Sequence, residues 1–196
     1  DLRRLENPTT DKVAATAASA MLRGARGNSG VILSLLMRGI SKKLKGTTEC
    51  DGALWAQALT EGVEAAYKAV MKPAEGTILT VARKGASAAR RAAEQNNDFE
   101  AVHEAAIAGA AAALANTINQ NPVLKKAGVV DAGGKGWLVA LEGMLSALRG
   151  EDIVAPVGGV EAKEAANFED FDTDEITFTY CTEFIIQREN DLDPEK

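Results

Sequence analysis

Apolar residues recur at intervals of three and four through almost the whole of residues 10–149. In the clearest example the positions are Phe99, Val102, Ala106, Ile107, Ala110, Ala113, Leu114 and Ile118. This spacing places the side chains along one face of an α-helix. Comparable patterns predict further helices over residues 13–25, 31–45, 54–70, 78–93 and 137–148. We therefore expect an all-α fold over this length.

Short breaks with turn-forming residues separate these helices. They are Lys72–Gly76, Asn96–Asp98 and Gln120–Pro122. Connections this short make neighbouring helices antiparallel, and the many alanines allow the helices to approach closely. We predict an up-and-down antiparallel helical bundle or barrel over residues 1–150, in which the short Pro122–Lys126 turn is part of a connection.

The composition changes after residue 150. Residues 151–175 are acidic, with few large apolar side chains, and are expected to form a linker. Residues 176–186 begin with alternating apolar and polar positions, which is the pattern of a β-strand. Because one strand cannot form a sheet, we interpret residues 176–196 as the first strand of a following domain, or as an edge added to a partner. Cys181 in this segment is expected to be a packing residue.

Charge is distributed unevenly, and this limits the classes of ligand. Residues 1–50 carry nine Lys/Arg and four Asp/Glu, a net charge of +5, whereas residues 151–196 carry three and fourteen, a net charge of −11. The basic first quarter suits an anionic ligand. A total charge of −6 with 5% aromatic residues argues against nucleic acid as a partner.

The sequence also favours a cytoplasmic setting. The two cysteines, Cys50 and Cys181, lack metal-ligand spacing and are too far apart to suggest a disulfide framework. No apolar run reaches the length of a transmembrane segment, and residues 1–20 lack the order of a secretion signal.

The segment Gly24–Gly30 contains three glycines and lies between two helical patterns. Glycine lets the backbone approach an anion closely, and the start of the helix expected from Val31 to Lys45 attracts negative charge. Asn28 and Ser29 are suited either to cap that helix or to bind a phosphate oxygen. Two interpretations stay open: a phosphate-binding loop, or a pair of helix caps without a ligand.

Two further glycine-rich breaks precede helices. Lys72–Ile78 contains a glycine and a threonine at a helix start, and Ala127–Gly136 contains four glycines and one aspartate. In an up-and-down bundle, alternate connections lie at the same end. Even numbers of helices separate the three glycine-rich loops, so we predict that they converge on one nucleotide-type ligand.

Other candidate residues have simpler interpretations. His103, the only histidine, has no Ser, Cys or Asp partner at catalytic spacing and is interpreted as structural. Glu61 and Glu64 lie on adjacent turns but lack the Glu-x-x-His motif of metal sites in bundles, so a solvated helix face explains them. We identify no catalytic residue and no metal ligand.

Three motifs resemble a known family. Residues 24–34 are GARGNSGVILS, residues 67–81 are YKAVMKPAEGTILTV, and residues 128–136 are GVVDAGGKG. In this order and spacing, residues 10–150 look very like the bacterial fatty acid kinase A subunit, whose amino-terminal domain is similar to the L subunit of dihydroxyacetone kinases. Residues 180–184, YCTEF, resemble the opening of the middle domain of that family.

The resemblance implies a helical barrel that binds ATP or ADP in loops at one end. It also implies transfer of the γ-phosphate to the carboxylate of a fatty acid held by a separate, DegV-like carrier protein, giving an acyl-phosphate for phospholipid synthesis. A homodimer through the full-length protein is a further expectation. The nucleotide-binding residues implied are Arg26, Gly27, Asn28, Ser29, Gly30, Thr77, Ile78, Asp131, Gly133 and Gly134.

The chain departs from the family at its start. The family carries an acidic Gly-Asp-x-Asp-Thr-Gly segment before the first motif, whose aspartates hold Mg²⁺, and residues 1–11 contain no match. We therefore expect a domain without its first helix, with the Mg²⁺ ligands outside this chain, and inactive by itself. Two alternatives stay open: a kinase of small hydroxy-ketones such as dihydroxyacetone, and a non-catalytic helical scaffold that docks a partner.

Overall fold

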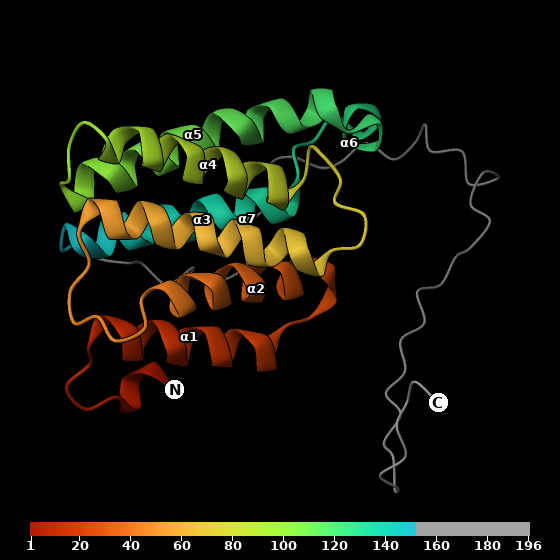
Figure 1. Ribbon diagram of the computed structural model, residues 1–196. Coiled ribbons are helices and arrows are strands. Elements are labelled where there is room, and N and C mark those ends of the chain that lie inside the picture. The colour runs from red at the N-terminus through yellow and green to blue at the C-terminus, as the bar shows by residue number, and fades with distance from the viewer. Residues whose placement is uncertain (152–196) are drawn as a thin grey trace, which may run out of the picture.

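The computed structural model describes residues 1–151, which form a short 3-10 helix and seven α-helices (Figure 1). The 3-10 helix is Leu2–Arg4. The α-helices are α1 (Thr10–Gly24), α2 (Gly27–Lys43), α3 (Gly52–Ala69), α4 (Ile78–Ala93), α5 (Phe99–Gln120), α6 (Pro122–Ala127) and α7 (Ala132–Leu148). The all-α prediction is confirmed for these residues. The linker and strand predicted over 152–196, with Cys181, lie outside the described residues.

The long helices run alternately up and down, as the short connections predicted (Figure 1). Helices α1 to α5 each pack against the next helix in sequence, and α7 packs against α4 and α5. Helix α3 also contacts α5, so α3, α4, α5 and α7 surround the centre of the core, while α1 packs mainly on α2. The antiparallel bundle is therefore the observed architecture.

Small residues bring neighbouring helix backbones into contact. A Cβ atom added at Gly39 of α2 would lie 2.4 Å from the carbonyl oxygen of Glu61 on α3. One added at Gly85 of α4 would lie 3.0 Å from the carbonyl oxygen of Ala106 on α5. A side chain at either position would crowd the backbone of the neighbouring helix, which explains the glycines at these two contacts.

The starts of α2 and α7 differ most from the predictions. Helix α7 begins at Ala132 rather than at residue 137, so Gly133, Gly134 and Gly136 lie inside the helix and not in the turn before it. Helix α2 begins at Gly27 and ends at Lys43, rather than running from Val31 to Lys45. Its N-cap is Arg26, so Asn28 and Ser29 lie inside the first turn and do not cap the helix. The reason is the positive φ of Gly27, +64°, which turns the chain into the helix earlier than the apolar pattern indicates.

Helix α5 is long and apolar enough to cross a membrane by length and composition alone. In the structure it packs against α3, α4 and α7, and it carries the fully buried His103. Because this buried polar side chain is hydrogen-bonded to α3 and α7, we identify α5 as a core helix of the bundle.

His103 joins three helices through hydrogen bonds. Its Nδ1 atom accepts from the indole N–H of Trp55 on α3 at 2.9 Å, and its Nε2 atom lies 2.9 Å from the carbonyl oxygen of Leu141 on α7. Since Nδ1 is an acceptor, the proton of the neutral ring is on Nε2, which donates to Leu141. The ring also stacks on Phe99, with centroids 5.8 Å apart. The structural interpretation of His103 is confirmed.

Burial lowers the pKa of His103 below its ordinary value of 6.5, and a second ring proton would point at the Trp55 N–H. We expect the free energy of unfolding to be constant above pH 6.5 and to fall below it, because the unfolded chain takes up this proton first. The fall continues down to the lowered pKa of the folded state. Urea unfolding between pH 7.5 and pH 5 measures this. His103 is the only histidine, so a flat profile would contradict the prediction.

Candidate functional site

Three turns meet at one end of the bundle, the right-hand end in Figure 1. They connect α1 to α2, α3 to α4, and α6 to α7. A Cβ atom added at Gly133 of α7 would lie 3.1 Å from Ser29 Oγ, 3.3 Å from Ile78 Cβ and 3.3 Å from Asp131 Oδ2. Residues from all three glycine-rich loops are therefore direct neighbours, as the even spacing of the helices predicted.

The start of α2 is open to solvent. Gly27, Asn28 and Ser29 are exposed, and no side chain caps the helix. The guanidinium of Arg26 donates to the carbonyl oxygen of Ala25 at 2.8 Å, which holds this side chain beside the turn. The N–H groups in the first turn of a helix have no partner within the helix. This turn therefore offers donors to an anionic ligand.

The start of α4 is similar in one respect. Thr77 is its N-cap, but the hydroxyl donates to the carbonyl oxygen of Ala74 at 2.8 Å instead of accepting from the helix. Ile78 follows and is buried against the core. The first turn of α4 is thus also without a side-chain cap, next to the apolar contact that Ile78 makes with α7.

The start of α7 is built differently. The Oδ2 atom of Asp131 accepts from the N–H of Gly134 at 2.7 Å and caps the helix. The N–H of Asp131 donates to the Thr117 hydroxyl of α5 at 3.1 Å. Asp131 is therefore a structural cap that fixes α7 on α5, with Gly133 facing the other two turns.

Together, three helix N-termini point to one region. Each carries a partial positive charge of about +0.5, and two of them lack a side-chain acceptor. Backbone N–H groups and aligned dipoles are the recurring elements of phosphate sites. The geometry therefore suits an anion, bound against the first turns of α2 and α4.

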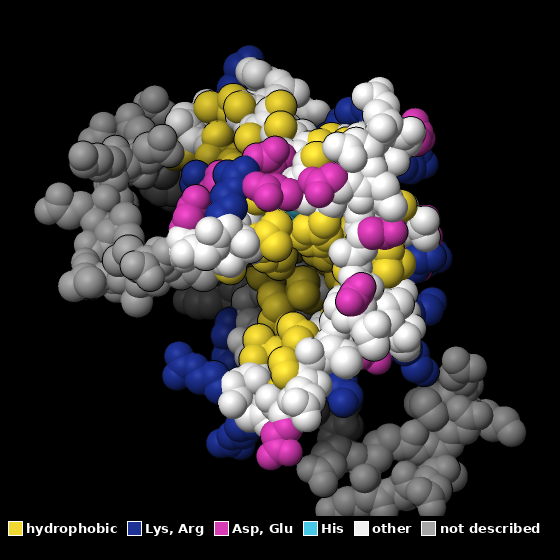
Figure 2. All heavy atoms as spheres, turned by 90° about the vertical axis from the view of Figure 1, so that its left-hand side faces the viewer, with side chains coloured by type: hydrophobic (Ala, Val, Ile, Leu, Met, Phe, Trp, Pro, Cys, Tyr) yellow, Lys and Arg dark blue, Asp and Glu magenta, His cyan; other side chains and the backbone are white. Residues whose placement is uncertain are grey.

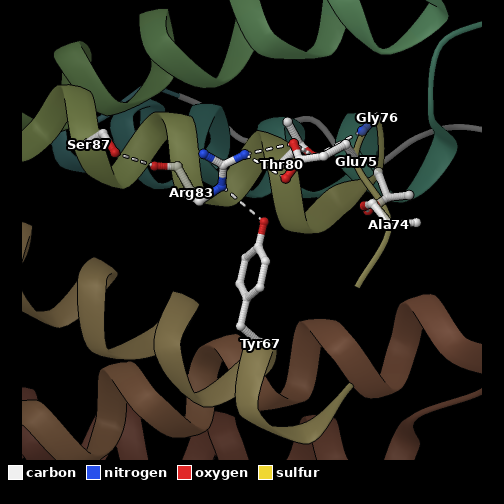
Figure 3. Close-up of polar contacts among 8 residues, drawn as sticks. Tyr67, Ala74, Glu75, Gly76, Thr80, Arg83 and Ser87 are labelled. Carbon is white, nitrogen blue, oxygen red and sulfur yellow. Dashed lines mark hydrogen bonds and ion pairs between the residues drawn. The ribbon is translucent and has the colours of Figure 1, made fainter. Parts of the chain in front are cut away.

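Sequence reasoning missed four residues that shape this end. Glu75, Thr80 and Arg83 form a hydrogen-bonded network with Tyr67 behind the α3–α4 turn (Figure 3). Glu75 and Arg83 are eight residues apart, in a loop and on a helix, and no local rule pairs residues at that separation. Only the folded position of the loop brings them together.

A cavity of about 770 Å³ lies at the opposite end of the bundle. Its lining is mainly apolar and includes Trp55, Phe99, Met144 and Leu148. Figure 2 faces this end and shows hydrophobic side chains in a hollow bordered by acidic ones. The cavity is remote from the three turns, so it is not the site predicted from the glycine-rich loops.

Mg²⁺ is implied by the resemblance, but the carboxylates at the three turns do not fit it. Asp131 is engaged as a helix cap, and Glu75 is paired with Arg83. Within residues 1–151, no group of three or more His, Cys, Asp or Glu side chains could hold a metal ion.

Two glycines of α7 make a matched test of this packing. A Cβ atom at Gly134 would lie 2.7 Å from Val81 Cγ2, whereas one at Gly136 would meet nothing within 4 Å. We expect Gly134→Ala to destabilise the fold by about 1–3 kcal/mol through overpacking. Gly136→Ala should stabilise it by roughly 0.5–1 kcal/mol, as in any helix interior. Urea unfolding of both variants measures this, and equal effects would contradict the packing described.

Sequence comparisons assign most of this chain to a known domain family. Residues 1–146 match the DAK2 domain. Over 177 residues the chain is 46% identical to uncharacterized proteins of Staphylococcus aureus strains USA300, N315 and MRSA252. The alignments cover 88% of this chain and 32% of each relative, so the chain spans about a third of the length of the curated relatives it matches. Because the domain covers most of the sequence, the chain belongs to the DAK2 domain family.

Proposed function

We propose that residues 1–150 are the ATP-binding domain of a fatty acid kinase. In this proposal the complete protein transfers the γ-phosphate of ATP to the carboxylate of a fatty acid held by a separate carrier protein. The observation that carries the proposal is the meeting of three helix N-termini around Ser29, Ile78 and Gly133. Membership of the DAK2 family, which is related to the dihydroxyacetone kinases, supports a kinase role in general.

The exposed first turn of α2 is the proposed phosphate site. Gly27, Asn28, Ser29 and Gly30 would donate to phosphate oxygens, and Arg26 would add a positive charge at the edge. Thr77 and Ile78 would line the nucleotide, with Asp131, Gly133 and Gly134 placed over the nucleoside. The capped start of α7 supports a shaping role for this last turn, since its Gly134 N–H is already bonded.

Mg²⁺ would neutralise the charge on the β- and γ-phosphates when it is bound. Because Asp131 and Glu75 are engaged within the fold, we propose that its ligands come from outside residues 1–151. The described residues then bind and orient the nucleotide, without holding the metal.

The scaffold alternative predicts that the glycines serve packing alone. Gly134 fits that reading, because Val81 leaves no room for a side chain there. Gly27 does not serve packing, since a Cβ atom there would meet nothing within 4 Å, and its φ of +64° gives it a backbone role at the start of α2 instead. The turn at the start of α2 is exposed and has no side-chain cap, which favours a ligand-binding role over a packing role.

The identity of the phosphate acceptor distinguishes a fatty acid kinase from a kinase of small hydroxy-ketones. The complete protein is incubated with ATP and Mg²⁺ and either a fatty acid on its carrier or dihydroxyacetone, and ADP release is measured. We expect release that depends on both the fatty acid and the carrier, with an acyl-phosphate product. ADP release that depends on dihydroxyacetone instead would establish a kinase of small hydroxy-ketones. A complete protein that does not bind ATP would support the non-catalytic scaffold.

Ser29→Ala in the complete protein tests the phosphate site directly. Loss of one positioned donor to a reacting anion costs about 2.7–4 kcal/mol of transition-state stabilisation, so kcat should fall about 100-fold or more. The free energy of unfolding should change by no more than about 0.5 kcal/mol, because Ser29 is exposed and does not cap α2. Turnover and urea unfolding are measured on the same samples.

Ser41→Ala is the matched control, since Ser41 lies near the other end of the same helix. It should leave turnover unchanged. Normal activity of Ser29→Ala would contradict the assignment of Ser29 to the phosphates.

A further inference from the structure

Arg83 of α4 connects two elements on either side of it (Figure 3). Its Nε atom donates to the hydroxyl oxygen of Tyr67 on α3 at 3.0 Å. Its Nη2 atom donates to both carboxylate oxygens of Glu75 in the α3–α4 turn, at 2.8 and 2.7 Å. A planar guanidinium can make these bonds at once, because its donors lie in a fixed fork. Arg83 therefore links the end of α3 to the turn that follows it.

The network continues from Glu75 into the backbone of the turn. Glu75 Oε2 accepts from the Thr80 hydroxyl at 2.9 Å, and the oxygen of that hydroxyl accepts from the Gly76 N–H at 3.0 Å. Gly76 has a φ of +74°, which favours glycine. Its peptide is thus held in one orientation immediately before Thr77 and Ile78.

The same turn rests on the end of α5. A Cβ atom at Gly76 would lie 3.1 Å from the carbonyl oxygen of Thr117, and the hydroxyl of Thr117 accepts from the N–H of Asp131. One residue of α5 therefore contacts both the α3–α4 turn and the start of α7. A shift of Gly76 would disturb two of the three turns at the candidate site.

The small free energy expected from the Arg83–Glu75 ion pair indicates its role. The side chains of Arg83 and Glu75 are 38% and 55% exposed, and exposed pairs contribute only about 0–1 kcal/mol to stability. Such a pair adds little to the stability of the whole fold. The two hydrogen bonds from Nη2 to the Glu75 carboxylate instead define the position of the turn, and the guanidinium neutralises a carboxylate beside helix ends that suit an anion.

We propose that Arg83 is a positioning residue for nucleotide binding. It holds Glu75, and through Glu75 and Thr80 it holds Gly76, so that Thr77 and Ile78 stay in place beside Ser29 and Gly133. It also cancels the Glu75 charge, which would otherwise repel phosphates. This inference rests on the proposed ATP site but does not depend on which acceptor receives the phosphate.

The test compares Arg83→Met with Lys84→Met in the complete protein. Both remove one cation from α4, but Lys84 is exposed and takes no part in this network. We expect Arg83→Met to raise KM for ATP by about tenfold or more, to leave KM for the acceptor unchanged, and to shift Tm no more than the control. Arg83→Lys should be intermediate, because an ammonium cannot fork to both partners.

Two further measurements separate positioning from general loss of structure. Amide hydrogen exchange over residues 74–80 should be faster in Arg83→Met than in Lys84→Met, with exchange in α5 unchanged. Adding Glu75→Gln to Arg83→Met should raise KM for ATP no further, because both changes break the same network. Unaltered exchange in residues 74–80 would overturn the positioning role.

The outcomes also distinguish this inference from the proposed function. A wild-type protein that fails to bind ATP would overturn the proposed function and this inference with it. Wild-type binding with an equal KM for ATP in Arg83→Met would overturn this inference alone and leave the ATP site standing. If Arg83→Met had the wild-type KM for ATP but a lowered Tm, the Arg83–Glu75 pair would be a purely structural contact.

Discussion

The contact between the first turn of α7 and α4 is the constraint on which the candidate site depends. Gly134 packs on Val81 so closely that a Cβ atom would lie 2.7 Å from it. This places Gly133 against Ile78 and Ser29, residues of the other two turns. Gly133 and Gly134 lie in the same helical turn and have no side chains. The start of α7 can therefore approach both α4 and the start of α2, and the three helix N-termini lie close together.

The two ends of the bundle differ in chemistry. One end has exposed backbone donors at α2 and an uncapped α4, which suit an anion. The other end has a cavity of about 770 Å³ lined by Trp55, Phe99 and other apolar side chains. Next to this cavity, the hydrogen bonds of His103 to Trp55 and Leu141 tie α3, α5 and α7 together. These hydrogen bonds fix the helices at the cavity end, whereas the start of α2 at the other end is exposed to solvent.

Much of this architecture could be predicted from local patterns. The apolar spacing located α4 and α5 almost to the residue, because a buried stripe at helical period is a strong signal. The convergence of the three glycine-rich loops followed from counting antiparallel helices. The start of α2 was misplaced, since a glycine with φ of +64° begins the helix before its apolar face does. Asn28 and Ser29 consequently lie in the first turn, where they present donors and do not cap.

The sequence by itself determined the helices, their antiparallel order and the end at which the glycine-rich turns lie, because periodicity and turn chemistry act over a few residues. Only the tertiary structure decided which polar groups are already engaged. The Asp131 carboxylate is bonded to the Gly134 N–H, Glu75 is bonded to Arg83, and His103 is satisfied on both ring nitrogens. The physical reason is that a hydrogen bond depends on distance and direction between groups from different elements, which no spacing along the chain defines.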